Sequence, residues 1–427
     1  METPRFDAPI AELSALPERS AGVHFPALDG YRALAALMVV TTHVSFATGL
    51  VLSAPFGPLY SRLDSGVTIF FVLSGFLLFR PWSLAAMTGG LGPRLAAYGL
   101  RRGARVLPAY WLVVIFTLLV LPEIRPVPVA AWWKNLALLH IYFGEKLPDG
   151  LTQMWSLATE VAFYLALPLI AWVAGRRHRG DPDASARWQL RVLAGLALTA
   201  VAWNLIRTVG PLEHALQAGY WLPGHLDWFA AGMAMAVISA RISLPNAGRG
   251  WNTCIRLASD TSTCVIAAIA IFAIGYTPIG GAYAFEQAPA LGPFLKHSLY
   301  GMFALLLLAP GILNPTAHGR WHRAFGSPIA RFLGLISYGI FLWNQVLLSL
   351  IIPAIGIRPF SGNFVLVWFL TVVATVLVAT ASFYLLERPL QRWSHRRTSP
   401  SGFPQPDQPP TPLPPLPSRQ THPPEPH

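Results

Sequence analysis

The stretch "LDGYRALAALMVVTTHV", residues 28–44, opens the first long apolar run of the chain, yet it contains Asp29, Arg32 and His43. An apolar run of about 20 residues has the length of a helix that crosses a bilayer. Ionisable groups are rare in such helices, because they are costly to bury in hydrocarbon, and they usually face a cavity or a partner. The stretch therefore predicts a membrane helix that carries part of a functional site.

The composition of the whole chain indicates a polytopic membrane protein. Of its 427 residues 54% are hydrophobic and 12% are charged, whereas soluble domains have roughly 25% charged residues. The net charge of +12 does not indicate nucleic-acid binding, because the basic residues lie between apolar runs and form no basic domain. The two cysteines, Cys254 and Cys264, form no metal-binding pattern, and we predict no metal and no bound cofactor.

Ten windows of the sequence have membrane-spanning length, which predicts an all-α fold of about ten transmembrane helices. The windows cover residues 28–50, 65–88, 104–122, 154–175, 189–207, 224–240, 259–276, 293–313, 328–352 and 362–386. The shorter stretch 127–143 contains Lys134, Asn135 and a pair of tryptophans. We predict that it lies at the membrane interface, with an eleventh span as the alternative.

The basic residues alternate between the loops that join these windows. Arginines are frequent after the second, fourth, sixth, eighth and tenth windows, whereas the other loops hold few basic residues, such as Arg207 and Lys296. Cytoplasmic loops are enriched in Lys and Arg. The alternation predicts that both termini are cytoplasmic.

The chain divides into three segments by composition. Residues 1–25 form a cytoplasmic N-terminal segment, and because they lack an apolar core we expect no cleavable signal peptide. Residues 26–393 form the transmembrane domain. Residues 394–427 are rich in proline, which predicts a disordered cytoplasmic tail and no appended soluble domain.

Arg32 and His43 are 11 residues apart, close to three helical turns, so they share a helix face about 16 Å apart along the axis. Arg32 lies near the cytoplasmic end, where its side chain can also reach the interface by snorkelling. His43 lies deeper, where packing alone explains a histidine less well than function does. Asp29, at the helix start, is expected to cap or anchor the helix.

A carboxylate in the fourth window is the predicted partner of this histidine. Glu160 lies about six residues inside the outer end of its window, at a depth similar to that of His43. A buried carboxylate needs a partner, and a carboxylate that orients an imidazole forms a proton-transfer pair. The alternative is a purely structural contact between two helices.

Further polar residues lie near the same outer depth. His225 and Asp227 begin the sixth window, and Asn344 with Gln345 lies inside the ninth. For Asp227 helix capping competes with a role in the site, and for Asn344 the competing role is an interhelical hydrogen bond. We predict that Asp227, Asn344 and Trp155 contact the substrate.

Three arginines in "RRGARVLPAYW", residues 101–111, face the predicted cytoplasmic side. Arg102 and Arg105 are three residues apart and project from one helix face. Clustered arginines suit phosphate binding, although the same charges also serve to orient the protein in the membrane.

These motifs together resemble the acyltransferase-3 family of membrane acyltransferases. The resemblance covers about residues 26–393 and is carried in order by the opening stretch and by "GVTIFFVLSGFLL", "RRGARVLPAYW", "WSLATEVAFYLALP", "LDWFAAGMAMA", "ISYGIFLWNQ" and "ERPLQR". It implies transfer of an acyl group, commonly acetyl from acetyl-CoA, to a hydroxyl of a sugar, glycan, lipid headgroup or glycosylated small molecule. It also implies a bacterial inner-membrane protein, here without an appended SGNH domain.

Carried onto this chain, the resemblance makes Arg32, Arg102 and Arg105 a site for the CoA phosphates. It makes His43 and Glu160 catalytic residues. The chain departs from the family pattern at two positions. Thr68 stands where an acidic residue is frequent, and Asn344 stands where the ninth span often has histidine.

The predicted function is therefore O-acyl transfer from acyl-CoA to a carbohydrate, glycan or glycosylated small molecule. Ser74 and Ser156 are possible acyl carriers, although each also fits a hydrogen bond between helices. The alternatives are a transporter or flippase that uses the same polar residues, and a relative without catalytic activity. The acceptor, the acyl length and the oligomeric state stay open.

Overall fold

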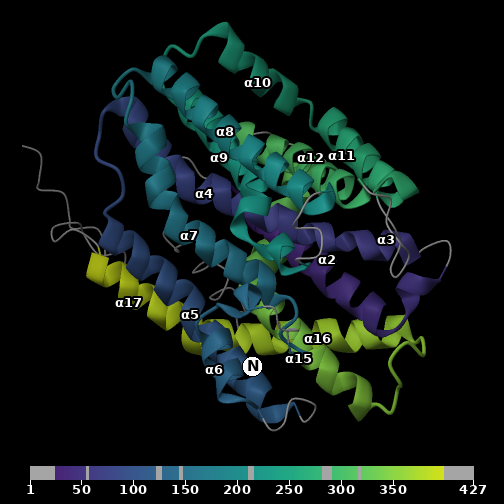
Figure 1. Ribbon diagram of the computed structural model, residues 1–427. Helices are drawn as coiled ribbons and strands as arrows, with labels where there is room; N and C mark the ends of the chain where they lie inside the picture. The colour runs from purple at the N-terminus through teal and green to yellow at the C-terminus, as the bar shows by residue number, and fades with distance from the viewer. Residues whose placement is uncertain are drawn as a thin grey trace, which may run out of the picture.

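The computed structural model describes residues 25–53, 57–121, 127–143, 148–209, 216–280, 291–315 and 319–398. Within these residues every element is helical (Figure 1). The α-helices are α2 (Ala27–Ala47), α3 (Gly57–Ser61), α4 (Gly66–Thr88), α5 (Leu95–Val120), α6 (Val129–Leu136), α7 (Met154–Gly175), α8 (Pro182–Val209), α9 (Leu226–Ile242), α10 (Arg249–Ser259), α11 (Thr261–Tyr276), α12 (Gly292–Leu313), α13 (Arg320–Phe325), α14 (Pro328–Leu335), α15 (Ser337–Ala354), α16 (Phe364–Ser382) and α17 (Arg388–Thr398). The predicted all-α fold is confirmed.

Short helical turns connect several of these helices. They are η2 (Leu50–Leu52), η3 (Arg62–Ser65), η5 (His140–Tyr142), η6 (Leu216–Tyr220), η7 (Leu222–His225) and η8 (Pro278–Gly280), and the π-helical turn η9 (Phe383–Glu387) joins α16 to α17. The predicted window 328–352 is divided at Ile336 into α14 and α15. Helix α17 continues to Thr398, past the predicted domain boundary at residue 393.

The described helices include seven that are long and apolar enough to cross a membrane, or eight if the bent pair α10 and α11 is one span. That pair is bent by 72°. The two remaining predicted windows correspond to α2, which carries charged residues, and to α9, which has 17 residues. The full count of ten spans therefore stays a prediction. Helix α6 has only eight residues, about 12 Å of helix, which argues against the alternative of an eleventh span.

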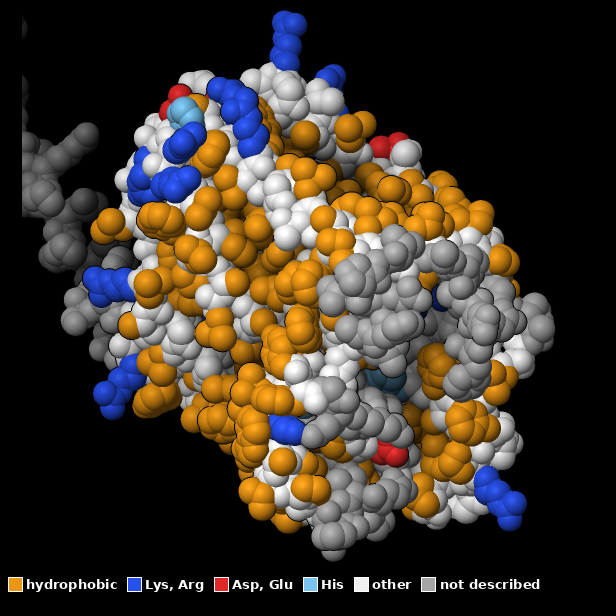
Figure 2. Space-filling model, in the orientation of Figure 1, with side chains coloured by type: hydrophobic (Ala, Val, Ile, Leu, Met, Phe, Trp, Pro, Cys, Tyr) orange, Lys and Arg blue, Asp and Glu red, His pale blue; other side chains and the backbone are white. Residues whose placement is uncertain are grey.

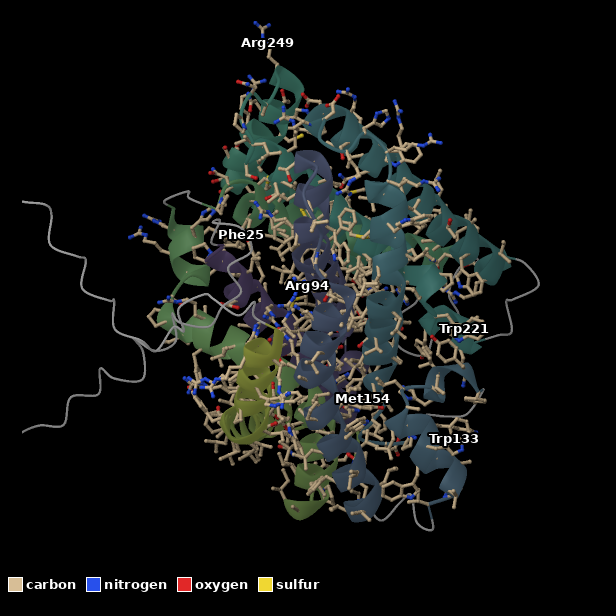
Figure 3. All side chains as sticks on the ribbon, turned by 90° about the vertical axis from the view of Figure 1, so that its left-hand side faces the viewer. Phe25, Arg94, Trp133, Met154, Trp221 and Arg249 are labelled. Atoms are coloured by element: carbon tan, nitrogen blue, oxygen red, sulfur yellow. The ribbon has the colours of Figure 1, made fainter. Side chains whose placement is uncertain are left out.

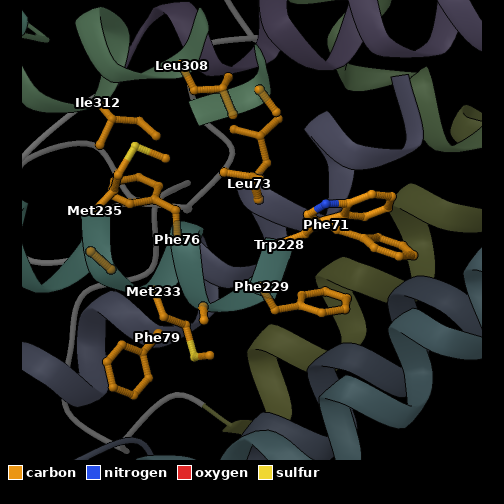
Figure 4. Close-up of a cluster of buried hydrophobic side chains, with 14 of the residues drawn as sticks. Phe71, Leu73, Phe76, Phe79, Trp228, Phe229, Met233, Met235, Leu308 and Ile312 are labelled. Carbon is orange, nitrogen blue, oxygen red and sulfur yellow. The ribbon is translucent and has the colours of Figure 1, made fainter. Parts of the chain in front are cut away.

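The core is built where α4 crosses α9 and both meet α12 (Figure 4). Glycines allow the two backbones to approach: a Cβ at Gly232 would lie 1.9 Å from the carbonyl oxygen of Val72, and one at Gly75 would lie 2.3 Å from that of Phe229. The ring of Phe229 stacks on Phe163 at 4.0 Å between centroids. Small residues at a membrane helix crossing favour such close packing. In lipid the hydrophobic effect does not drive helices together, so van der Waals contact between them stabilises the crossing.

Helix α2 is enclosed by other helices. It packs against α4, α14, α15 and α16, and at its start a Cβ at Gly334 would meet the backbone of Asp29 at 2.1 Å. Tyr31, Ala35 and Val44 are fully buried. Because protein surrounds α2, its ionisable side chains need not contact lipid.

The outer surface of the bundle is apolar, as expected for contact with lipid. Figure 2 shows hydrophobic side chains over most of the described surface on one face, with Lys and Arg gathered near its edges. Large exposed hydrophobic residues include Leu165, Leu198, Ile266, Leu377 and Leu385. The protein is thus a multi-pass membrane protein.

The two ends of the bundle separate the predicted sides of the membrane. In Figure 3 the predicted cytoplasmic residues Arg249, Phe25 and Arg94 run from the top of the view to its middle, and the predicted outer residues Met154, Trp133 and Trp221 lie below or to the right of them. Which end faces the cytoplasm stays a prediction. The segments 1–24 and 399–427, which hold most of the predicted terminal domains, lie outside the described residues.

We expect Gly232→Leu to destabilise the bundle by about 3 kcal/mol or more, because the new side chain meets backbone atoms that cannot move aside. The control is Gly195→Leu on α8, where a Cβ meets nothing within 4 Å. Thermal unfolding in detergent measures both variants. Equal midpoints for the two would contradict this account of the crossing.

Candidate functional site

A cavity of about 300 Å³ lies at the predicted outer end of the helices. It is bounded by residues of α2, η3, α4, α7, α8, η6, η7, α9 and α12. Its polar and aromatic lining residues are Thr42, His43, Asp64, Gln153, Trp155, Asn204, Arg207, Tyr220, His225, Trp228, Lys296, His297 and Tyr300. The volume lies at the lower end of the range for small-molecule sites.

His43 is held in the cavity wall by Asn344 of α15. The distance from His43 Nδ1 to Asn344 Oδ1 is 2.6 Å. The Asn344 amide group donates to the carbonyl oxygens of Ile340, at 3.0 Å, and Phe341, at 2.7 Å. This network assigns the oxygen of Asn344 to the side of His43, so Nδ1 of the neutral imidazole carries the proton. Nε2 of His43 is then left with a lone pair that can accept a proton.

Asp64 and His43 both line the cavity, and the Asp64 carboxylate lies within electrostatic range of the imidazole. Lys296 Nζ of α12 lies 2.7 Å from Asp64 Oδ2, and the Tyr300 hydroxyl donates to Asp64 Oδ1. Two donors therefore fix this carboxylate at the edge of the site. Asp64 lies one helical turn before Thr68, so it places a negative charge close to the position where the family often has one.

Aromatic rings form one wall of the cavity. The indole of Trp155 faces Tyr220 at 4.9 Å and His225 at 5.5 Å between ring centroids. His225 Nε2 donates to the carbonyl oxygen of Gly219 at 3.0 Å, which leaves its buried Nδ1 without a hydrogen-bond partner among the described residues. The structure thus places Trp155 where a ligand in the cavity would contact it.

Asp227 contacts a histidine that lines the cavity. His297 Nε2 lies 2.9 Å from both carboxylate oxygens of Asp227, and the His297 ring stacks on Trp228 at 4.1 Å. Asp227 also accepts from the backbone N–H of Trp228 at 2.9 Å in the first turn of α9. His297 lines the cavity, whereas Asp227 is not among the lining residues and lies behind His297. The predicted contact between Asp227 and substrate stays a prediction.

Glu160 is not paired with His43. Its carboxylate accepts from the Ser74 hydroxyl of α4 and from the Tyr164 hydroxyl at 2.7 Å. Trp155 and Glu160 are five residues apart on α7, which separates them by about 140° around the helix. Because Trp155 faces the cavity, Glu160 points away from it. The predicted contact fails because equal depth in the membrane does not place two residues on facing sides of their helices.

Glu160 belongs instead to a second polar cluster that includes the arginines of α5. The phenols of Tyr98 and Tyr164 lie within electrostatic range of both Arg102 and Glu160. The Tyr98 hydroxyl donates to the carbonyl oxygen of Tyr164 at 3.0 Å. The Nε atom of Arg102 is buried without a hydrogen-bond partner among the described residues.

The second arginine of this cluster faces the last helices of the chain. Arg105 lies within electrostatic range of Tyr164 and of Glu387, which belongs to η9. The Tyr338 hydroxyl of α15 donates to the carbonyl oxygen of Val106 at 2.8 Å. Helices α5, α7 and α15 thus meet at this cluster, which combines two cations with several phenols and carboxylates.

Arg32 pairs locally with Asp29, with 3.9 Å between Nη1 and Oδ1. The side chain of Arg32 is 16% exposed, so it can still meet a ligand at this end of α2. Among the described residues Asp29 makes this ion pair in the first turn and no side-chain cap was found at the start of α2. The expectation that Asp29 anchors the helix start through its charge agrees with this contact.

The two serines considered as acyl carriers make hydrogen bonds inside the bundle. Ser74 donates to Glu160, and Ser156 donates to the carbonyl oxygen of Gln153 at 3.1 Å. The first bond joins two helices, as the alternative role for this serine proposed. Across the part of the chain that the structure describes, no group of three His, Cys, Asp or Glu side chains could hold a metal ion.

Four ionisable residues of the cavity, Asp64, Arg207, Lys296 and His297, were not among the predicted site residues. Asp64 directly precedes a predicted window, Arg207 ends one, and Lys296 and His297 begin another. We interpreted Arg207 and Lys296 only as basic residues that indicate which side of the membrane their loops face. Their position at the ends of apolar windows, in loops otherwise poor in charge, was the available signal.

The comparisons with known proteins agree with these motifs. The chain matches a family model described as an acyltransferase domain over residues 25–384. Peptidoglycan O-acetyltransferase OatA of Listeria monocytogenes is 26% identical over 397 residues, which cover 86% of this chain and 56% of that protein. The exopolysaccharide production protein ExoZ of Rhizobium meliloti is 26% identical over 348 residues, covering 79% of this chain and 93% of that protein.

O-acetyltransferase OatA of Staphylococcus aureus is 30% identical over 161 residues, covering 34% of this chain and 24% of that protein. The chain spans little more than half the length of the Listeria relative. No solved structure matches the chain significantly. Because the family model covers more than half of its residues, this multi-pass membrane protein belongs to the acyltransferase-3 family.

Proposed function

We propose that the protein transfers an acyl group, commonly acetyl, from acyl-CoA to a hydroxyl of a carbohydrate. The observation that carries the proposal is the His43–Asn344 contact at the cavity, because it leaves an unprotonated imidazole nitrogen beside a space for a small molecule. The names of the peptidoglycan and exopolysaccharide relatives support a carbohydrate acceptor.

The donor end of the proposed path lies at the second polar cluster. Arg102 and Arg105 supply guanidinium groups there, and Arg32 supplies a third on α2; guanidinium groups bind phosphate oxygens through paired hydrogen bonds. The orphaned Nε of Arg102 supports an anionic ligand here. Glu160, near Arg102 and bonded to Ser74 and Tyr164, fixes the shape of this end and does not act on His43 directly.

The two ends of α2 connect donor and acceptor. Arg32 and His43 are 11 residues apart on one helix, about 16 Å along its axis. CoA carries its thioester at the end of an extended pantetheine arm, far from its phosphates. With the phosphates held by arginines, the arm can follow the bundle interior toward His43.

The chemistry at His43 is general base catalysis. Nε2 of His43 accepts the proton of the acceptor hydroxyl as that oxygen attacks the thioester carbonyl carbon. The carbon–sulfur bond breaks, and the CoA thiolate leaves and takes up the proton from the imidazolium. Asn344 holds the ring orientation, and the charge of Asp64 stabilises the imidazolium that forms.

Replacing His43 with Gln is expected to lower acetyl transfer by about 100-fold or more, since a general base contributes 10²–10⁴ to the rate. The test uses purified protein, radiolabelled acetyl-CoA and a soluble oligosaccharide acceptor. The control is His178→Asn, a loop residue with φ 56°, a backbone conformation that asparagine tolerates. Near-normal turnover of His43→Gln would remove His43 from the chemistry. Vectorial movement of acceptor without transfer would favour a transporter.

Replacing Arg102 with Gln is expected to raise the KM for acetyl-CoA by about tenfold, because a charge-assisted hydrogen bond to phosphate is lost. The KM for S-acetyl-pantetheine, which lacks the nucleotide phosphates, should change little. Arg396→Gln, at an exposed position of α17, is the control. An equal loss with both donors would show that Arg102 serves the fold and does not bind phosphate.

Asn344→Leu is expected to lower kcat while leaving the KM for acetyl-CoA unchanged, because the imidazole loses the acceptor that fixes its tautomer. In ¹⁵N spectra of histidine-labelled protein, the signal of the Nδ1-protonated ring should give way to a tautomer mixture. Asn344→His, which restores an acceptor at this position, should recover part of kcat. An unchanged tautomer in Asn344→Leu would exclude the positioning role.

A further inference from the structure

Arg207 is the one charged side chain of the cavity without an ion partner among the described residues. Asp64 is engaged by Lys296 and Tyr300, and the His297 ring is engaged by Asp227. Arg207 lines the same cavity, and its Nε is buried without a hydrogen-bond partner. The cavity therefore holds a surplus positive charge that the described residues do not neutralise.

The partly buried side chain of Arg207 packs its guanidinium against Gly219, where an added Cβ would lie 3.5 Å from Arg207 Nη1. One helical turn earlier, Asn204 donates to the carbonyl oxygens of Ala200, at 3.0 Å, and Gly224, at 2.7 Å. Asn204 also lines the cavity, and its amide oxygen can accept a hydrogen bond from a ligand. Arg207 thus belongs to the wall of the cavity.

An unpaired guanidinium is costly to desolvate, and a carboxylate or a phosphate matches its planar pair of donors. The other walls offer rings of Trp155, Tyr220 and Trp228, whose flat faces suit an amphipathic ring such as a sugar. His43 lies in the same cavity, so a ligand that fills it reaches the proposed base.

We propose that the acceptor is an anionic carbohydrate, and that Arg207 binds its carboxylate or phosphate group while His43 receives the proton of its hydroxyl. The acylation of this carbohydrate rests on the proposed function, whereas its binding through an anionic group rests on the cavity alone. It assigns a specificity role to Arg207: neutral sugars lack the group that pairs with the surplus charge.

Equilibrium binding to purified protein in detergent tests this claim without catalysis. The probes are glucuronic acid for a carboxylate, glucose 1-phosphate for a phosphate and methyl glucoside as the neutral reference. We expect at least one charged probe to bind wild type about tenfold or more tightly than methyl glucoside, because hydrogen bonds to a charged group are the stronger ones. The tighter of the two charged probes identifies the source of the anion.

Arg207→Gln should abolish this preference while leaving methyl glucoside binding unchanged, and Arg207→Lys should retain part of it because the charge remains. The matched control is Arg191→Gln, an exposed arginine at the other end of α8, which should behave as wild type. Unchanged methyl glucoside binding also shows that each variant is folded. Equal affinity for charged and neutral probes, no binding of either charged probe to wild type, or a preference that survives Arg207→Gln would overturn the inference.

The transfer assay separates this inference from the proposed function. Charge-selective binding without acetyl transfer would refute the proposed function and keep the anion site. Transfer to neutral and charged acceptors with equal KM values, unaffected by Arg207→Gln, would keep the function and refute the anion site.

Discussion

Enclosure of α2 by protein is the constraint on which the rest of the structure depends. A helix that carries Asp29, Arg32 and His43 cannot face lipid without a large cost in free energy. Helices α4, α14, α15 and α16 pack around it, and glycines at several contacts let backbones approach closely. The apolar residues of the bundle therefore build the environment that permits polar chemistry on its central helix.

Polar residues inside the bundle form two groups with different characters. Around Arg102 and Glu160, cations, phenols and carboxylates meet where α5 and α7 approach, which suits a phosphorylated donor. Around His43, an imidazole held by Asn344 lies beside a cavity with aromatic walls, one carboxylate paired with a lysine, and an arginine unpaired among the described residues. In the proposed mechanism α2, with Arg32 toward one end and His43 toward the other, lets donor and acceptor enter from opposite ends and meet inside the protein.

The sequence predicts the fold class, most helix positions and the segregation of basic loops, because hydropathy and charge are properties of single segments. His43 and Trp155 were both predicted as site residues, and the structure brings both to the cavity. The partners of Glu160 could not be predicted from the sequence, and its predicted pairing with His43 is not observed. Depth follows from position along a helix, but partner choice depends on the rotation of each helix, which only packing determines. The contacts of Asn344 with His43 and of Asp227 with His297 likewise depend on how the helices are rotated.

Arg207 and Lys296 show the other limit of sequence reasoning. A basic residue at a helix end serves topology or a site equally well, and only the cavity distinguishes the two roles. The central claim, that α2 connects a donor site to an acceptor site, is tested most directly by an experimental structure with a non-transferable acetyl-CoA analogue. The account predicts phosphates at Arg102 and Arg105 and the acyl carbon beside Nε2 of His43. Binding of the CoA phosphates in the cavity at Arg207 would contradict this account.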